Sequence, residues 1–153
     1  MFETIGGIPL HPLVVHAAVV LVPLASLLVI AYAVSARFRS WSALLVPLAA
    51  TVAFVTVPLA TQSGESLEHS VTRTELINAH TEMGEGAIPF AIGLVVLAWG
   101  MWWFHRTDRR DVLTKVAAGL AIVAALGCIV QIVRIGHSGA EAVWTGVVSS
   151  ASP

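Results

Sequence analysis

The sequence has few charged residues and almost no cysteine, and each shortage excludes a class of protein. Of its 153 residues, 11% are charged, and the net charge is -1. No basic run is longer than Arg109-Arg110, so we expect no nucleic acid partner. The single cysteine, Cys128, excludes an internal disulfide and a Cys-x-x-Cys-His site for covalent haem attachment. Walker, dinucleotide-binding, Gly-x-Ser-x-Gly and His-Glu-x-x-His motifs are also absent, so hydrolases and nucleotide-dependent enzymes have no support.

Long apolar runs take up most of the chain instead. Hydrophobic residues make up 57% of it, and the mean hydropathy is +0.86, values typical of an integral membrane protein in contact with a lipid bilayer. About 20 apolar residues suffice to cross a bilayer as a helix. Four runs of this kind cover about residues 12–36, 41–61, 74–104 and 112–135. We therefore expect an all-α protein in which residues 1–153 form a single membrane domain.

Local signals mark the ends of these predicted helices. Pro12 suits the first turn of the first helix. Thr72 and Glu75 have the spacing of a capping box, which predicts a helix beginning there and continuing through His80. We expect Gly136-His137-Ser138-Gly139 to break the fourth helix into a short tail.

Basic residues in the short loops predict the orientation. They lie between the first and second helices and between the third and fourth, at Arg37, Arg39, Arg106, Arg109, Arg110 and Lys115. By the positive-inside rule both loops are cytoplasmic. The sequence thus predicts an up-down-up-down four-helix bundle with both termini extracytoplasmic.

Five of the six histidines lie beside the predicted extracytoplasmic end: His11, His16, His69, His80 and His137. An imidazole in an apolar segment is costly unless it has a partner, which favours His16 as an inward ligand. His16, His80 and His137 come from three different helices at similar depth, so we expect them to share a buried site. His11 would supplement it from the rim, and Arg134 would bind an anionic group such as a haem propionate or a carboxylate.

Imidazoles from different helices hold the iron in four-helix membrane cytochromes. The leading interpretation is therefore an electron-transfer protein that binds a b-type haem and works with a quinone or an extracytoplasmic electron carrier. A second interpretation is a Zn or Cu site built from the histidines, with Glu65, Glu68 and His69 as weaker ligands. A third is a non-catalytic subunit of a homo-oligomer or larger membrane complex, whose histidines form interhelical hydrogen bonds. No catalytic residue is assigned.

The segment Leu10-His11-Pro12-Leu13-Val14-Val15-His16 resembles the opening of a family of small bacterial membrane proteins known as domain of unknown function 2231. The resemblance extends over the whole chain, through His80 and the glycine-rich stretch after Ile135, and it departs at Ala140, Glu141 and Trp144. It implies a multi-pass protein of the bacterial inner membrane. Fusion of related sequences to Rieske-type or cytochrome c domains implies electron carriers as neighbours, by association only.

Overall fold

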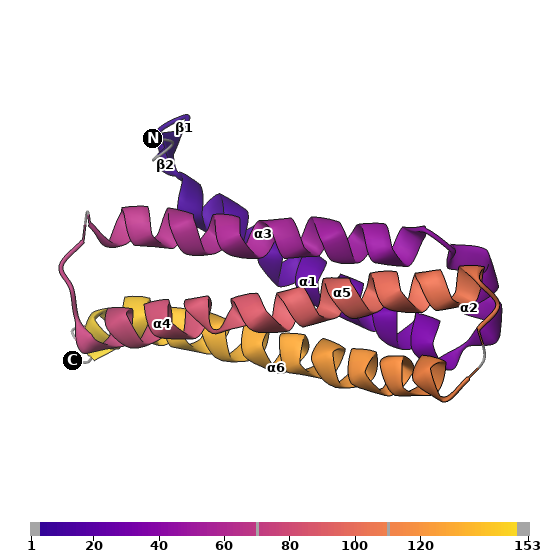
Figure 1. Cartoon of the computed structure of the whole chain (residues 1–153). Helices are drawn as coiled ribbons and strands as arrows, with labels where there is room; N and C mark the ends of the chain where they lie inside the picture. The colour runs from indigo at the N-terminus through magenta and orange to yellow at the C-terminus, as the bar shows by residue number, and fades with distance from the viewer. Residues whose placement is uncertain (1–3, 70, 110, 150–153) are drawn as a thin grey trace.

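The computed structural model describes residues 4–69, 71–109 and 111–149 (Figure 1). The chain opens with a short antiparallel ribbon of β1 (Thr4–Ile5) and β2 (Ile8–Pro9). The turn between them needs positive φ at Gly6 and Gly7, 60° and 82°, which glycine adopts without steric cost. The helices follow in the order α1 (Leu10–Val34), α2 (Ala36–Ser42), α3 (Leu45–Glu68), α4 (Glu75–Glu85), α5 (Ala87–Arg106) and α6 (Val112–Ser149).

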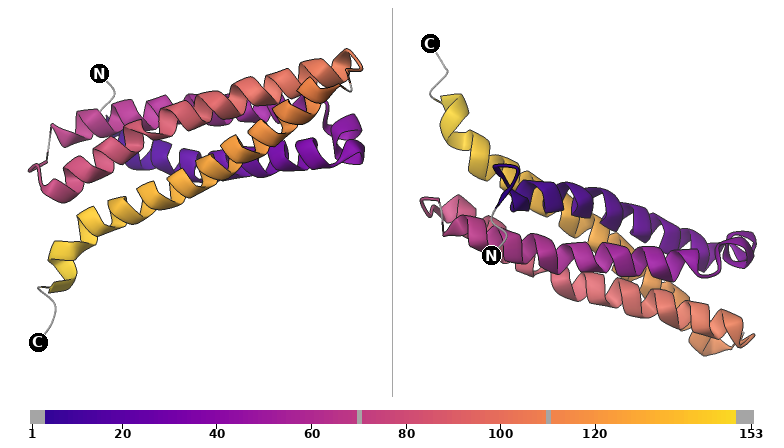
Figure 2. Two further views of the ribbon diagram at one scale, coloured as in Figure 1. Left: turned by 60° about the horizontal axis from the view of Figure 1, so that its bottom comes forward. Right: turned by 90° about the horizontal axis from the view of Figure 1, so that it is seen from above.

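The long helices form a four-membered bundle. α1 and α3 make one hairpin around α2, while α4 and α5 run on in one direction and α6 returns beside them (Figures 1 and 2). Both α1 and α5 pack mainly against α3 and α6 and touch each other little, so they occupy opposite corners of the bundle. The predicted all-α four-helix architecture is confirmed.

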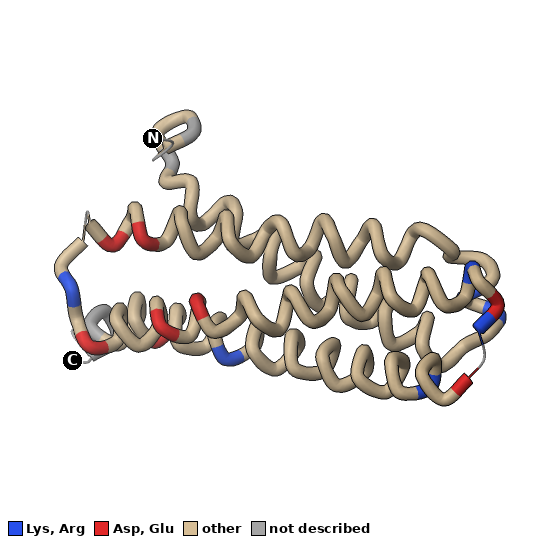
Figure 3. The backbone as a smooth tube through the Cα atoms, viewed as in Figure 1, with Lys and Arg blue, Asp and Glu red and all other residues tan. Residues whose placement is uncertain are grey.

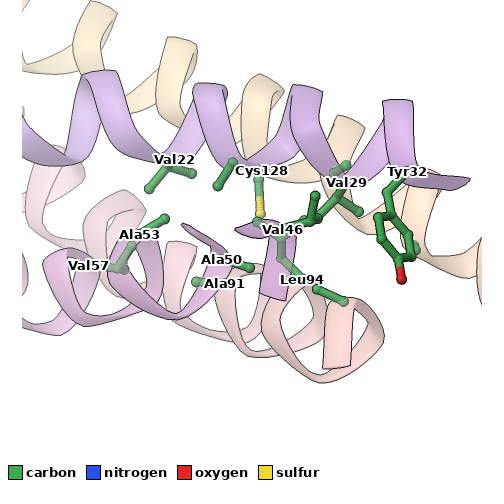
Figure 4. Packing of buried hydrophobic residues seen from close by; sticks show 14 of the residues in the cluster. Val22, Val29, Tyr32, Val46, Ala50, Ala53, Val57, Ala91, Leu94 and Cys128 are labelled. Atoms are coloured by element: carbon green, nitrogen blue, oxygen red, sulfur yellow. The ribbon is translucent and has the colours of Figure 1, made fainter. Parts of the chain in front are cut away.

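Small side chains fill the centre of the bundle. On α1 buried positions at 18, 22, 25, 29 and 32 recur every three or four residues and lie on one face, with Ser26 buried beside them. Ala50, Ala53 and Ala91 lie opposite them (Figure 4), and such small residues let helix backbones approach closely. The outer faces are also apolar, with Leu27, Val123 and similar side chains more than half exposed. A helix that is apolar all round is typical of a membrane span.

Charged residues lie at the two ends of the bundle and leave its middle free of charge (Figure 3). We call one end the basic end; it carries Arg37, Arg39, Arg106, Asp108, Arg109, Asp111 and Lys115. We call the other the acidic end; it carries Glu65, Glu68, Arg73, Glu75, Glu82, Glu85, Arg134 and Glu141. Four segments are each long and apolar enough to cross a membrane: Leu10–Val34, Leu45–Glu68, Glu75–Arg106 and Val112–Thr145.

Several predicted helix ends are wrong. α3 continues to Glu68, about two turns beyond the expected end near residue 61. The N-cap of α4 is Thr74, whose Oγ1 accepts a hydrogen bond from the Ile77 N–H at 3.3 Å, and the expected capping box at Thr72 does not form. A side chain can cap a helix only if the backbone before it turns out of the helix, and the spacing of residue types alone does not decide which threonine does so.

The glycines of the last two helices also behave differently from expectation. α6 runs unbroken through 136–139, because α4 packs against this part of it and tertiary contacts outweigh the low helix propensity of glycine. The third helix, by contrast, is interrupted at Gly86, between α4 and α5. The buried side chain of Gln131 donates a hydrogen bond to the Met83 carbonyl there at 2.8 Å.

Candidate functional site

His11 is held against α3 at the acidic end. It lies in the first turn of α1, and its Nδ1 is 3.1 Å from the Ala60 carbonyl oxygen and 3.2 Å from Ser63 Oγ. Its ring lies over Gly64, where an added Cβ would come within 3.0 Å of the ring Cε1. Only glycine at position 64 leaves the imidazole this place without displacing it.

His80 is held against α6 in the same way. It lies on α4, and its Nδ1 is 3.0 Å from Ser138 Oγ. The ring lies over Gly139, where an added Cβ would come within 3.0 Å of Cε1. Each histidine therefore rests on a Ser-Gly pair of the neighbouring helix.

The hydrogen bonds determine which nitrogen of each ring is free. Ser63 Oγ donates its only proton to the Ala60 carbonyl at 2.9 Å, and Ser138 Oγ donates to Ile135 at 3.0 Å. Each hydroxyl can then only accept from the imidazole, so the proton of the neutral ring is on Nδ1. Nε2 keeps its lone pair. Metal-binding histidines commonly show this arrangement, with Nδ1–H bonded to the protein and Nε2 on the metal.

The two histidine sites belong to two equivalent hairpins. Five of the six buried positions of α1, all except Ser26, correspond to the buried positions 87, 91, 94, 98 and 101 of α5 with a constant offset of 69 residues, which also relates His11 to His80. Positions 46, 50 and 53 of α3 correspond to 121, 125 and 128 of α6 with an offset of 75, which also relates Ser63-Gly64 to Ser138-Gly139. The bundle is thus a pair of similar hairpins related by an approximate two-fold axis.

His11 and His80 lie on opposite sides of this axis at the acidic end. They belong to α1 and to the rod formed by α4 and α5, which occupy opposite corners of the bundle. Both imidazoles are partly buried. Two equivalent imidazoles with free Nε2 atoms therefore approach the bundle from opposite corners.

The expectation that His16 and His137 point into the bundle is wrong. His16 is exposed on the outer face of α1, where its Nδ1 donates to the Pro12 carbonyl one turn earlier. His137 is 76% exposed, and its Nε2 lies 3.5 Å from Glu141 Oε1 on the same helix. Ser138, the next residue along α6, is buried, and a rotation of about 100° per residue turns His137 away from its partner His80. His80 is the one of the three that lies inward.

The charged residues singled out in the sequence do not gather around the histidines. Arg134 is exposed on α6 and forms no ion pair with any other described residue. Glu68 Oε1 instead pairs with Arg73 Nε at 3.3 Å, while Glu65 and His69 are exposed. Over the described ranges, no group of three or more His, Cys, Asp or Glu residues is placed to hold a metal ion.

Sequence reasoning missed the two Ser-Gly pairs as parts of the site. The signal was present: each pair lies near the end of a returning helix, and each follows a histidine at the start of the outgoing helix, by 52 residues for His11 and 58 for His80. Recognising it requires comparing the two halves of the chain with each other.

The fold and the site together define the class of protein. Four long apolar helices, with their described charged residues gathered toward the two ends of the bundle, make it a multi-pass membrane protein with four candidate spans. The sequence model of the family described as predicted membrane protein, DUF2231, matches residues 7–152, and the chain belongs to that family. No curated protein and no solved structure matches the chain. The family resemblance seen in the sequence is confirmed.

Proposed function

We propose that the protein binds a b-type haem at the acidic end, with Nε2 of His11 and of His80 as the two axial ligands, and transfers electrons through it. The observation that carries the proposal is the pair of equivalent imidazoles on opposite corners of the bundle, each with Nδ1 bonded to the serine of a Ser-Gly pair. Haem iron takes one axial ligand on each face of a planar ring. A site with approximate two-fold symmetry matches that requirement.

The surroundings of His80 support a flat ligand. Gly84 lies one turn after His80 on α4, and a Cβ added there would meet nothing within 4 Å. Ala87 continues the same face one turn further. In this proposal the edge of the macrocycle lies in the open space at Gly84, beside the imidazole, while Ala87 packs in the core.

The hydrogen bonds to Nδ1 would also set the chemistry of the iron. A carbonyl or hydroxyl acceptor on Nδ1–H raises the basicity of the ligating nitrogen and fixes the orientation of the ring. Burial and these contacts are the means by which a protein tunes a haem potential. Ser63 and Ser138 are therefore positioning residues in this proposal.

We further propose that the basic end faces the cytoplasm of a bacterial inner membrane. Arg37, Arg39, Arg106, Arg109 and Lys115 all lie at that end, as the positive-inside rule requires of short cytoplasmic loops. The histidine pair then lies near the outer leaflet. A quinone or an extracytoplasmic electron carrier is the partner that can reach it.

An absorption spectrum of the purified, dithionite-reduced protein tests the haem proposal. Expression with added haem should give a Soret band and about one haem per chain. The variants His11→Ala and His80→Ala should lose the band, whereas His16→Ala and His137→Ala, which change outward imidazoles at the same end, should keep it. A wild-type protein without a Soret band would contradict the proposal, as would loss of the band only in the two outward variants.

A second candidate function rests on the same contacts. The bonds of His11 to Ser63 and of His80 to Ser138 join different helices, so the histidines can serve as structural ties in a non-catalytic subunit. Replacement of both histidines by glutamine separates the two functions, because glutamine can hydrogen-bond but does not ligate haem iron. Under the structural alternative the double variant keeps the protein's cellular function, and under the haem proposal it folds but loses the cofactor.

A further inference from the structure

A cleft at the basic end lies far from the histidine pair. It has a volume of about 310 Å³ and opens between the ends of α1 and α5, the start of α6 and the first residues of α2. Four basic side chains line it, at Arg39, His105, Arg109 and Lys115. Its floor includes the apolar side chains of Met101 and Ala118.

Tyr32 holds two of the basic side chains in place. Its ring is fully buried, the Arg39 guanidinium carbon lies 5.9 Å from the ring centroid, and His105 meets the ring edge-on at 6.4 Å. Arg39 Nη1 also donates hydrogen bonds to the carbonyls of Tyr32 and Ala33 at the end of α1. These bonds leave donors on Nε and Nη2 of a guanidinium whose position is already determined.

The charge of the cleft favours an anion. Arg39, Arg109 and Lys115 are permanent cations at neutral pH. Asp108 is the acidic residue among the lining side chains. The neighbouring Asp111 is engaged in capping α6, where its Oδ1 accepts from the Thr114 N–H at 3.2 Å. Guanidinium and ammonium groups gathered in this way are typical of phosphate recognition.

We propose that this cleft binds the phosphate group of an anionic phospholipid. The cations supply the partners for a phosphate ester, and the apolar floor beside them supplies a surface for the start of an acyl chain. The cleft lies where the apolar spans end and the charged loop begins, which is the depth of lipid headgroups. A cleft of this volume accommodates a headgroup.

Lipid retention measures this binding directly. The full-length protein is reconstituted in nanodiscs of phosphatidylcholine with a minor share of phosphatidylglycerol, and lipid that remains bound is counted by native mass spectrometry. We expect retained phosphatidylglycerol, and a loss of about tenfold in apparent affinity, or about 1.4 kcal/mol, in Lys115→Gln and Arg109→Gln. Arg39 also caps α1, so Arg39→Gln changes the fold as well as the charge. Its effect is therefore interpreted only together with those of Lys115→Gln and Arg109→Gln.

Arg37→Gln and Arg106→Gln are the matched controls, because they remove the same charge at the same end outside the cleft. They should retain wild-type lipid binding. An equal loss in the controls would overturn the proposal in favour of general surface charge, and equal retention of phosphatidylcholine would overturn it as well. Displacement by millimolar inorganic phosphate would identify a free phosphate, and not a lipid, as the ligand.

Discussion

At the scale of single residues, two glycines decide where the inward imidazoles lie. Gly64 and Gly139 let the His11 and His80 rings rest directly on the neighbouring helix, because neither glycine has a side chain that would hold the ring away. The serine before each glycine then orients the ring through Nδ1. The site therefore depends on the lack of a side chain at Gly64 and Gly139 as much as on the histidines.

Replacing Gly64 by Ala tests this dependence. The new Cβ would meet the His11 ring at 3.0 Å, so the imidazole must shift and its bond to Ser63 weakens. We expect haem occupancy in the reduced spectrum to fall severalfold while the helix itself remains intact. Gly136→Ala is the control, because its Cβ meets nothing within 4 Å and helix propensity should stabilise it by up to about 1 kcal/mol. Equal occupancy in both variants would show that the close approach is unimportant.

At the scale of helices, the interruption between α4 and α5 is the one place in the described spans where a buried side-chain amide donates a hydrogen bond to a backbone carbonyl. Gly84, Gly86 and Pro89 lie within two turns, a composition that bends helices. Gln131 of α6 donates to the Met83 carbonyl at this bend. Gln131 therefore ties α6 to α4.

The variant Gln131→Leu should destabilise the bundle. It leaves the Met83 carbonyl without its partner in an apolar environment, which costs about 1–3 kcal/mol in the free energy of unfolding. Gln62→Leu makes the same change at an exposed position of α3 and should cost little. Unfolding titrations in detergent micelles measure both. If the two variants unfold alike, Gln131 has no structural role at the bend.

At the scale of the whole molecule, two similar hairpins make one bundle. Both hairpins start at the acidic end and turn at the basic end, so their approximate two-fold axis runs along the bundle. Equivalent residues of the two halves therefore come to the same end. This parallel arrangement places His11 and His80 at the acidic end and both basic loops at the basic end.

Cysteine labelling tests the proposed orientation. Cys128 is the only cysteine of the chain and is buried, so added cysteines report their own accessibility. With an impermeant maleimide, Thr72→Cys at the acidic end should be labelled in intact cells, and Ser40→Cys at the basic end only after permeabilisation. The reverse pattern would place the histidine pair on the cytoplasmic side and exclude an extracytoplasmic electron carrier.

The sequence by itself determined the class of the fold and the separation of charges between its ends. Apolar runs of spanning length can only become helices in a bilayer, because each backbone group must find its partner within the segment. The four spans and the acidic and basic ends are therefore local properties of the chain. The sequence also singled out His80, because it lies at a depth similar to that of His16 and His137 in the predicted helices.

Only the tertiary structure decided which histidines lie inward and where the helices end. On α1 alone the sequence favours His16 over His11, and it is Ser63-Gly64 on α3, some 50 residues away, that holds His11 inward instead. In the same way α6 stays helical through Gly136 and Gly139, because α4 packs against it. Contacts of this kind join positions far apart in the chain, so no local pattern records them. The repeat of the hairpin is the exception, because a comparison of the two halves of the sequence reveals it.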